Sequence, residues 1–178
     1  SQAWRANWGA LRPVFLAAST HAFEEEIVLE AFSKIRDQIP DCLLLLVLRH
    51  PNRVPEVVPL LKSYRYKKRS EGDADTNTDI YVGDTIGELL TFYAACDVAF
   101  VAGSLMPIGG HNLLEPAAIG IAALTGPQFF NMKDITEQLI VAGAVEVITD
   151  ATSMCERVLY LLQNPEARTQ MGNAGRTL

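Results

Sequence analysis

Short apolar runs alternate along the chain with segments whose apolar residues recur at helical spacing. The continuous apolar run from Cys42 to Leu48 is typical of a central strand of a parallel sheet, buried on both faces. Glu24 to Ile39 places Val28, Phe32 and Ile35 on one side of a predicted helix. Such alternation predicts an α/β fold, a Rossmann-like parallel sheet flanked by helices.

The same patterns predict the remaining elements. Further strands are expected at Val14–Ala18, Asp79–Val82, Asp97–Val101, Ile121–Leu124 and Val145–Ile148. Further helices are expected at Pro55–Ser63, Ile86–Cys96, Leu113–Gly120, Lys133–Ala142, Thr152–Gln163 and from Pro165 to Leu178. A length of 178 residues is that of one domain with a substantial core, so residues 1–178 are predicted to form a single unit.

Composition excludes several classes of protein. The net charge of −6 argues against a general nucleic-acid binder, whose surface is usually basic. The three cysteines lie far apart in apolar stretches, which favours buried, reduced thiols. No apolar stretch approaches the ~20 residues of a membrane span, so this chain is expected to be soluble.

One basic run, Lys62 to Arg69, stands out in this acidic chain. Its simplest interpretation is a solvated loop or an edge strand. The alternative is contact with anionic lipid headgroups, as basic patches near membranes provide.

The segment Val101 to Ala117 carries the most specific signal. A glycine-rich loop leads from an apolar strand into a predicted helix, with Asn112 at the N-cap and Glu115 three residues later. The backbone N–H groups of such a helix start can bind anions or hydroxyls, and the Glu115 carboxylate can accept hydrogen bonds from a ribose diol. The alternative is that Asn112 and Glu115 only cap the helix.

Each conspicuous polar motif follows a predicted strand. In open α/β sheets ligands bind outside the carboxyl ends of the strands, so these motifs are expected to meet at one edge. Arg49 directly follows the Cys42–Leu48 strand. Its planar guanidinium can bind a phosphate or a carboxylate, and this interpretation is favoured over that of a surface charge at the end of a strand. The motifs are Ser19-Thr20-His21, Arg49-His50-Pro51, Gly83 to Glu88, Gly103 to Glu115 and Gly126-Pro127.

Other polar residues have simple structural interpretations. His21, His50 and His111 are more often structural than ligand-binding at such positions, and they lack the spacing of metal ligands. Residues 24–26, all glutamate, are most simply the acidic first turn of a helix. Glu88 is either a helix-start residue or a binding residue at the same edge.

Taken together, five motifs resemble the Kdo transferases, which are GT-B glycosyltransferases that move 3-deoxy-D-manno-octulosonic acid (Kdo) from CMP-Kdo. The matching strings are A-A-S-T-H from Ala17, R-H-P-x-R from Arg49, V-G-D-T-I-G-E-L from Val82, G-S-x-x-x-x-G-G-H-N-x-x-E-P-A from Gly103 and G-P…N-M-K-D-I from Gly126. Ala102, Leu48 and Leu113 depart from the family's usual glycine and prolines, without loss of a polar group.

This resemblance implies the C-terminal, donor-binding half of a GT-B enzyme that transfers Kdo to a lipid A precursor in lipopolysaccharide biosynthesis, with inversion and CMP as leaving group. The N-terminal acceptor domain, with its glutamate base and membrane anchor, is not matched by this chain, so no catalytic residue is assigned and the chain alone is expected to be inactive. The resemblance places the full-length protein at the cytoplasmic face of the bacterial inner membrane, and it implies no metal and no cofactor. The implied CMP-Kdo contacts are Ser19, Thr20, Leu48, Arg49, His50, Ile86, Gly87, Glu88, Ser104, Asn112, Leu113, Leu114 and Glu115.

Two other functions fit the same edge. A nucleotide-sugar epimerase half would prefer UDP and would need acid and base carboxylates in a two-domain chain. A non-catalytic nucleotide-binding module would need no partner domain. Titration with CMP, UMP and UDP separates these hypotheses.

Overall fold

A computed structural model describes residues 1–178 and contains a seven-stranded sheet of strand order β3-β4-β2-β1-β5-β6-β7. All neighbouring strands are parallel. The strands are β1 (Val14–Thr20), β2 (Leu43–Leu48), β3 (Tyr66–Lys68), β4 (Ile80–Gly83), β5 (Val98–Val101), β6 (Ala122–Thr125) and β7 (Val145–Val147). The predicted fold class, a parallel α/β sheet flanked by helices, is confirmed.

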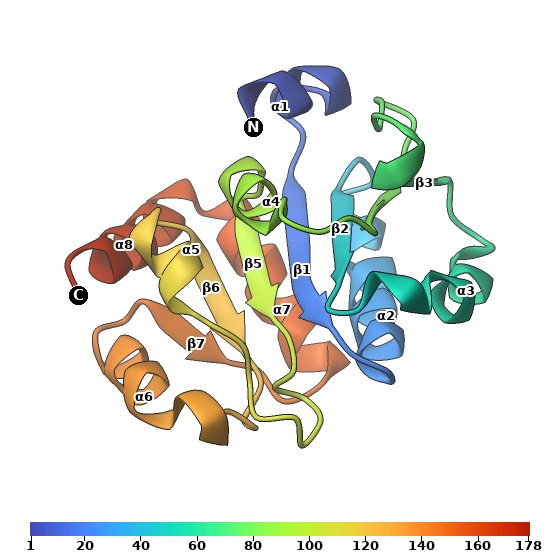
Figure 1. Cartoon of the computed structure of the whole chain (residues 1–178). Coiled ribbons are helices and arrows are strands. Elements are labelled where there is room, and N and C mark those ends of the chain that lie inside the picture. Colours follow the sequence, from blue (N-terminus) through green and yellow to red (C-terminus); the bar gives the residue numbers. More distant parts are fainter.

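Helices cover both faces of the sheet (Figure 1). The helices are α1 (Gln2–Trp8), α2 (Glu24–Gln38), α3 (Val54–Val57), α4 (Leu89–Ala95), α5 (Leu114–Ala118), α6 (Lys133–Val141), α7 (Ala151–Gln163) and α8 (Pro165–Arg176). Helices α2 and α7 pack on one face, whereas α1, α4, α5 and α6 supply buried side chains to the other. Short 3-10 turns lie at Pro51–Arg53, Val58–Leu61, Arg69–Glu71 and Phe130–Met132.

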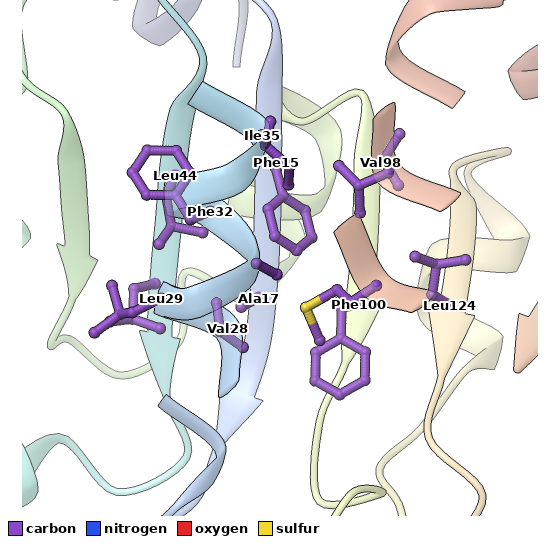
Figure 2. Close-up of a cluster of buried hydrophobic side chains, with 14 of the residues drawn as sticks. Phe15, Ala17, Val28, Leu29, Phe32, Ile35, Leu44, Val98, Phe100 and Leu124 are labelled. Atoms are coloured by element: carbon purple, nitrogen blue, oxygen red, sulfur yellow. The ribbon is translucent and has the colours of Figure 1, made fainter. Parts of the chain in front are cut away.

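Alternate residues of the strands enter the two hydrophobic cores, because successive side chains of a strand point to opposite faces. Phe15 and Leu44 face α2, where Phe32 and Ile35 pack against them in the larger core (Figure 2). Leu16 and Leu45, one position further along the same strands, belong to the second core. β1 and β2 are therefore buried on both sides, as their continuous apolar sequences predict.

The strand order reverses between β1 and β5. The chain runs from β1 outward through β2 to β3 at the edge of the sheet, forms β4 between β3 and β2, and then returns to pair β5 with the other side of β1. The loops after β1 and β5 consequently diverge to opposite sides of the sheet and leave a crevice between them. Ligands of open α/β sheets bind at such a switch point.

Most predicted elements lie within one or two residues of their observed bounds, but several boundaries were wrong. Ser19 and Thr20 belong to β1 and not to a loop after it; Ser19 has φ 62° and the register with β2 shifts between Ala18 and Thr20. The predicted helix Pro55–Ser63 is divided into short turns around α3. Residues Tyr66–Lys68 of the basic run form the edge strand β3, which was one of its two simple interpretations. Helix α1 was not predicted.

The cysteines behave as the sequence indicates. Cys42, Cys96 and Cys155 are free and buried. Burial raises the pKa of the Cys42 thiol to about 12, so this thiol is protonated and unreactive at neutral pH. No helix of the structure is long and apolar enough to cross a bilayer.

Truncation of a core aromatic should destabilise the fold strongly. Phe32 is fully buried between α2 and the sheet. We expect Phe32→Ala to lower the free energy of unfolding by about 3–5 kcal/mol, since it removes apolar contacts and leaves a cavity. The control Leu11→Ala, at a side chain that is 97% exposed, should stay within about 0.5 kcal/mol of wild type in urea unfolding. Equal midpoints for the two variants would contradict the assignment of this core.

Candidate binding site at the carboxyl edge of the sheet

A cavity of about 480 Å³ opens at the carboxyl edge of the sheet, above β1, β2 and β4. Its walls come from the end of β2, the loop between β4 and α4, and the loop between β5 and α5. The residues that line it are Ser19, Val47, Leu48, Arg49, His50, Pro51, Thr85, Ile86, Gly87, Leu89, Phe92, Tyr93, His111, Asn112 and Glu115. Segments far apart in the sequence thus converge where the strand pattern predicts.

The structure brings eight of the thirteen predicted site residues to this cavity. They are Ser19, Leu48, Arg49, His50, Ile86, Gly87, Asn112 and Glu115. The other five, Thr20, Glu88, Ser104, Leu113 and Leu114, do not line it.

Two of these five residues, Ser104 and Leu113, have clear structural roles instead. The Ser104 hydroxyl donates to the carbonyl of Val101 and accepts from the N–H of Gly126, each at 2.8 Å, and so joins the loops after β5 and β6. Leu113 is buried in the second core. The Thr20 hydroxyl is buried and has no hydrogen-bond partner.

Glu24 connects the two loops at the switch point. Its carboxylate is fully buried and accepts hydrogen bonds from the backbone N–H groups of Gly103, Ser104 and Leu105, at 2.9, 3.2 and 3.1 Å. It also accepts from the N–H of His21 at 3.0 Å. A buried carboxylate is costly unless such partners satisfy it, so the loop after β5 is held firmly to the start of α2.

The loop after β5 also depends on a close packing contact. Gly103 has φ 74°, a conformation that glycine adopts without strain. A Cβ at this position would lie 2.7 Å from the ring of His111, so the imidazole packs directly on the glycine. The site therefore requires glycine here on both counts.

A buried ion pair fixes the segment after β2. The guanidinium of Arg53 donates to both carboxylate oxygens of Glu25, at 3.0 and 2.9 Å, and the Glu25 side chain is 1% exposed. Such a two-pronged pair fixes orientation as well as position. It holds the turn that carries Arg49 and His50 against α2.

Arg49 is left without a partner inside the chain. Its backbone N–H bonds the carbonyl of Thr20 at 3.0 Å, but its exposed guanidinium makes no ion pair and no hydrogen bond within the protein. It lines the cavity at the end of β2. An unpaired guanidinium at the mouth of a cavity can donate hydrogen bonds to an anionic group of a ligand.

Glu88, by contrast, is occupied. Arg69 donates to both oxygens of the Glu88 carboxylate, with Nε 3.0 Å from Oε1 and Nη2 3.1 Å from Oε2, and the Thr85 hydroxyl donates to Oε1 at 2.7 Å. Hydrogen bonds from Arg69 lower the pKa of Glu88. The guanidinium of Arg69 also lies over the ring of Trp4 in α1, 4.8 Å from its centroid. Glu88 therefore positions the loop that contains Ile86 and Gly87.

The two helix starts at the cavity differ from their predictions. Helix α4 begins at Leu89 and not at Ile86, because Gly87 takes φ 86° and interrupts a helix there. Helix α5 begins at Leu114, with no side-chain cap, so the predicted capping pair of Asn112 and Glu115 is wrong. The Asn112 side chain instead accepts from the N–H of Leu114 at 2.9 Å. The Glu115 side chain makes no hydrogen bond within the protein, although its residue lines the cavity.

The three histidines lie together, although their spacing along the chain does not suggest it. The Nε2 atoms of His21 and His111 are 2.7 Å apart, and their rings are nearly parallel. The ring of His50 stands edge-on to His21, with 5.6 Å between centroids. Burial lowers the pKa of both His21 and His111, the latter to about 4. No cluster of three or more histidine, cysteine or acidic side chains has the arrangement of a metal site.

The basic run is largely neutralised by acidic neighbours. Arg65 pairs with Asp79, Lys68 with Glu71, and Arg69 with Glu88. Lys62 and Lys67 have no carboxylate within ion-pair distance. The run therefore presents less free positive charge than its sequence suggests.

Sequence reasoning missed the residues whose role depends on distant partners. Glu24 was assigned only to an acidic helix turn, yet it binds backbone groups 79 to 81 positions away. Phe92 and Tyr93 in α4 also line the cavity and were not predicted. The available signal was indirect: a glutamate at the start of the helix that follows the strand ending at the switch point.

Comparison with known proteins agrees with this architecture. The family model of glycosyl transferases group 1 matches residues 15–178. The chain is 41% identical to a 3-deoxy-D-manno-octulosonic acid transferase of Haemophilus influenzae over 96% of its length, and 38% identical to one of Bordetella pertussis over 98%. It spans only 41% and 42% of those two relatives.

Solved structures show the same likeness. The C-terminal CMP-Kdo binding domain of WaaA from Acinetobacter baumannii superposes with a TM-score of 0.92 at 34% identity, covering 98% of this chain and 93% of that one. WaaG, a glycosyltransferase of lipopolysaccharide biosynthesis, shares the fold with a TM-score of 0.63 at 17% identity, covering 99% of this chain and 45% of that one. The parallel sheet flanked by helices is that of a GT-B-like glycosyltransferase fold. The chain belongs to the group 1 glycosyl transferases.

The Glu24 bridge yields a direct test. We expect Glu24→Gln to lower the free energy of unfolding by about 1–3 kcal/mol, because the amide places an NH₂ group among N–H donors and leaves buried groups unpaired. Hydrogen exchange at Gly103, Ser104 and Leu105 should accelerate selectively. Glu26→Gln, at an exposed position of the same helix turn, is the matched control and should leave both measurements unchanged. Unaltered exchange in Glu24→Gln would show that the loop does not depend on this carboxylate.

Proposed function

We propose that this chain is the donor-binding domain of an inverting Kdo transferase, which moves Kdo from CMP-Kdo to a lipid A precursor in lipopolysaccharide biosynthesis. The observation that carries the proposal is the unpaired guanidinium of Arg49 at the mouth of a cavity on the switch-point edge. The 34% identity to a domain described as CMP-Kdo binding supports the choice of donor.

The cavity offers distinct groups to the parts of such a donor. Arg49 would contact the phosphate, since its planar fork suits phosphate oxygens and no internal carboxylate competes for it. Glu115 would accept hydrogen bonds from the ribose hydroxyls, since its carboxylate is free of partners inside the protein and its residue lines the same cavity. Phe92 and Tyr93 supply an aromatic wall.

The role of these groups in transfer would be orientation and charge stabilisation. Arg49 would stabilise negative charge that develops on the departing phosphate, and a fixed loop geometry would hold the sugar for attack. An N-terminal domain of the GT-B enzyme would bind the lipid acceptor and supply the general base. The predicted membrane location and the contact of Lys62–Arg69 with anionic lipid stay predictions, and the ion pairs of Arg65, Lys68 and Arg69 weigh against a strongly basic contact.

The two other functions are less well supported. A nucleotide-sugar epimerase half would use acid and base carboxylates at the reacting sugar, whereas Glu24 and Glu88 are both held in hydrogen bonds away from the cavity. A non-catalytic nucleotide-binding module stays an alternative. A titration separates the three functions.

Titration with nucleotides tests the donor class. We expect the isolated chain to bind CMP weakly and more tightly than UMP or UDP, and to transfer no Kdo by itself. Isothermal titration calorimetry and a transfer assay with a lipid A precursor measure the two properties. A preference for UDP would favour the epimerase, and transfer by the chain alone would refute the need for a partner domain.

Substitution of Arg49 tests the phosphate contact. Arg49→Lys keeps the positive charge but loses the planar fork, so CMP affinity should fall about tenfold, the cost of one charge-assisted hydrogen bond. Arg65→Lys, on the distant edge of the sheet, is the matched control and should bind CMP as the wild type does. Unchanged affinity and melting temperature in Arg49→Lys would make Arg49 an ordinary surface charge.

A further inference from the structure

Three imidazoles meet at the switch point, and the proposed phosphate and ribose contacts use none of them. His21 follows β1, His50 follows β2 and His111 lies in the loop after β5. His50 and His111 line the cavity beside Arg49. Glu24 accepts a hydrogen bond from the backbone N–H of His21, and the ring of His111 packs against Gly103, so the backbone of the first histidine and the ring of the second are held in place.

The contact between His21 and His111 restricts how many protons the pair can hold. At 2.7 Å between Nε2 atoms, one nitrogen must donate and the other must accept, because two N–H groups would collide. The pair can therefore be neutral, or it can carry one added proton as an imidazolium that donates to its neutral neighbour. A second added proton would break the contact.

The surroundings keep the pair neutral when the cavity is empty. Burial lowers the pKa of both imidazoles, and the nearby side chains of Arg49 and His50 act in the same direction. Arg53 also faces His21, but it is paired with Glu25. Glu24 opposes these effects on His21, although its carboxylate already accepts four backbone hydrogen bonds. An anion in the cavity would offset the charge of Arg49 and favour an added proton.

We propose that the His21–His111 pair is the subsite for the carboxylate of the donor sugar, and that it takes up one proton from solvent when the donor binds. This inference rests on the proposed function. CMP-Kdo carries one negative charge on its phosphodiester and a second on its sugar carboxylate. Arg49 matches the first charge, and the singly protonated pair, at the wall that His111 forms, matches the second.

The pair thereby distinguishes an acidic sugar from a neutral one. A neutral nucleotide sugar offers no second anion, so its binding would leave the pair unprotonated and without an ionic partner. After transfer the sugar carboxylate leaves with the product, and the pair returns the proton to solvent. No bond other than N–H forms or breaks in this step.

Kinetics of the full-length enzyme test the proposal. We expect His111→Gln, which hydrogen-bonds but does not titrate near neutral pH, to raise KM for CMP-Kdo about tenfold, the scale of one charged hydrogen bond, and to change the inhibition constant of CMP less than about twofold. His21→Gln should have the same effect, and the double variant should be no worse than either single variant, because the two rings act as one unit.

The pH profile supplies a readout that a structural role would not move. Neither the phosphodiester nor the sugar carboxylate titrates between about pH 5.5 and 8, so a pH dependence of KM for CMP-Kdo there reports the protein. If the bound donor favours the added proton, the pKa of the pair is higher in the complex than in the free enzyme. Affinity should therefore fall as pH rises between these two values and then level off, and His111→Gln should flatten this profile.

Two results would overturn the proposal while the proposed function stands. One is a parallel loss of CMP and CMP-Kdo affinity in both single variants. The other is a KM for CMP-Kdo with the same pH profile in wild type and variants. If CMP did not inhibit the wild-type enzyme at all, the proposed function itself would fail. Should His111→Gln not fold, as a melting curve reveals, His21→Gln alone decides between the outcomes.

Discussion

The carboxylate of Glu24 determines the geometry of the carboxyl edge. The loops after β1 and β5 diverge at the switch point, and without a bond between them each would be free to take its own conformation. Glu24 binds the N–H groups of three successive residues on one loop and that of His21 on the other. Since burying an ionised carboxylate is costly without such partners, the folded state admits one arrangement of the two loops. The shape of the cavity thus depends on a side chain that does not line it.

Much of the fold and part of the site could be predicted from the sequence, for a physical reason. Buried parallel strands are continuous apolar runs, and residues that follow them must meet at one edge of the sheet. Arg49 was placed correctly because Leu48 ends such a run, and Glu115 because it follows the strand that ends at Val101. Both inferences need only the strands and their common direction.

The structural roles that were wrongly predicted share a different cause. Asn112 and Glu115 have the spacing of a capping box, yet the backbone turns at Gly110, with φ 84°, and α5 begins later. Glu88 has the position of a ligand carboxylate, yet Arg69, 19 residues earlier, binds it. The roles of Glu24 and Ser104 likewise depend on bonds across the fold. Local spacing describes which groups are available, whereas tertiary contacts decide which of them stay free for a ligand.

The two outer strands have a consequence for how this protein meets other molecules. β3 and β7 are each three residues long, and Lys67, Lys68 and Glu146 lie on them. Short, charged edges are poor templates for strand addition from another chain, because few unpaired backbone groups are presented and bringing like charges together is unfavourable. The sheet is therefore protected at both edges against pairing with a strand of another molecule. A second polypeptide would have to be recognised by side chains on loops and helices, so such contacts can change in sequence without altering the sheet.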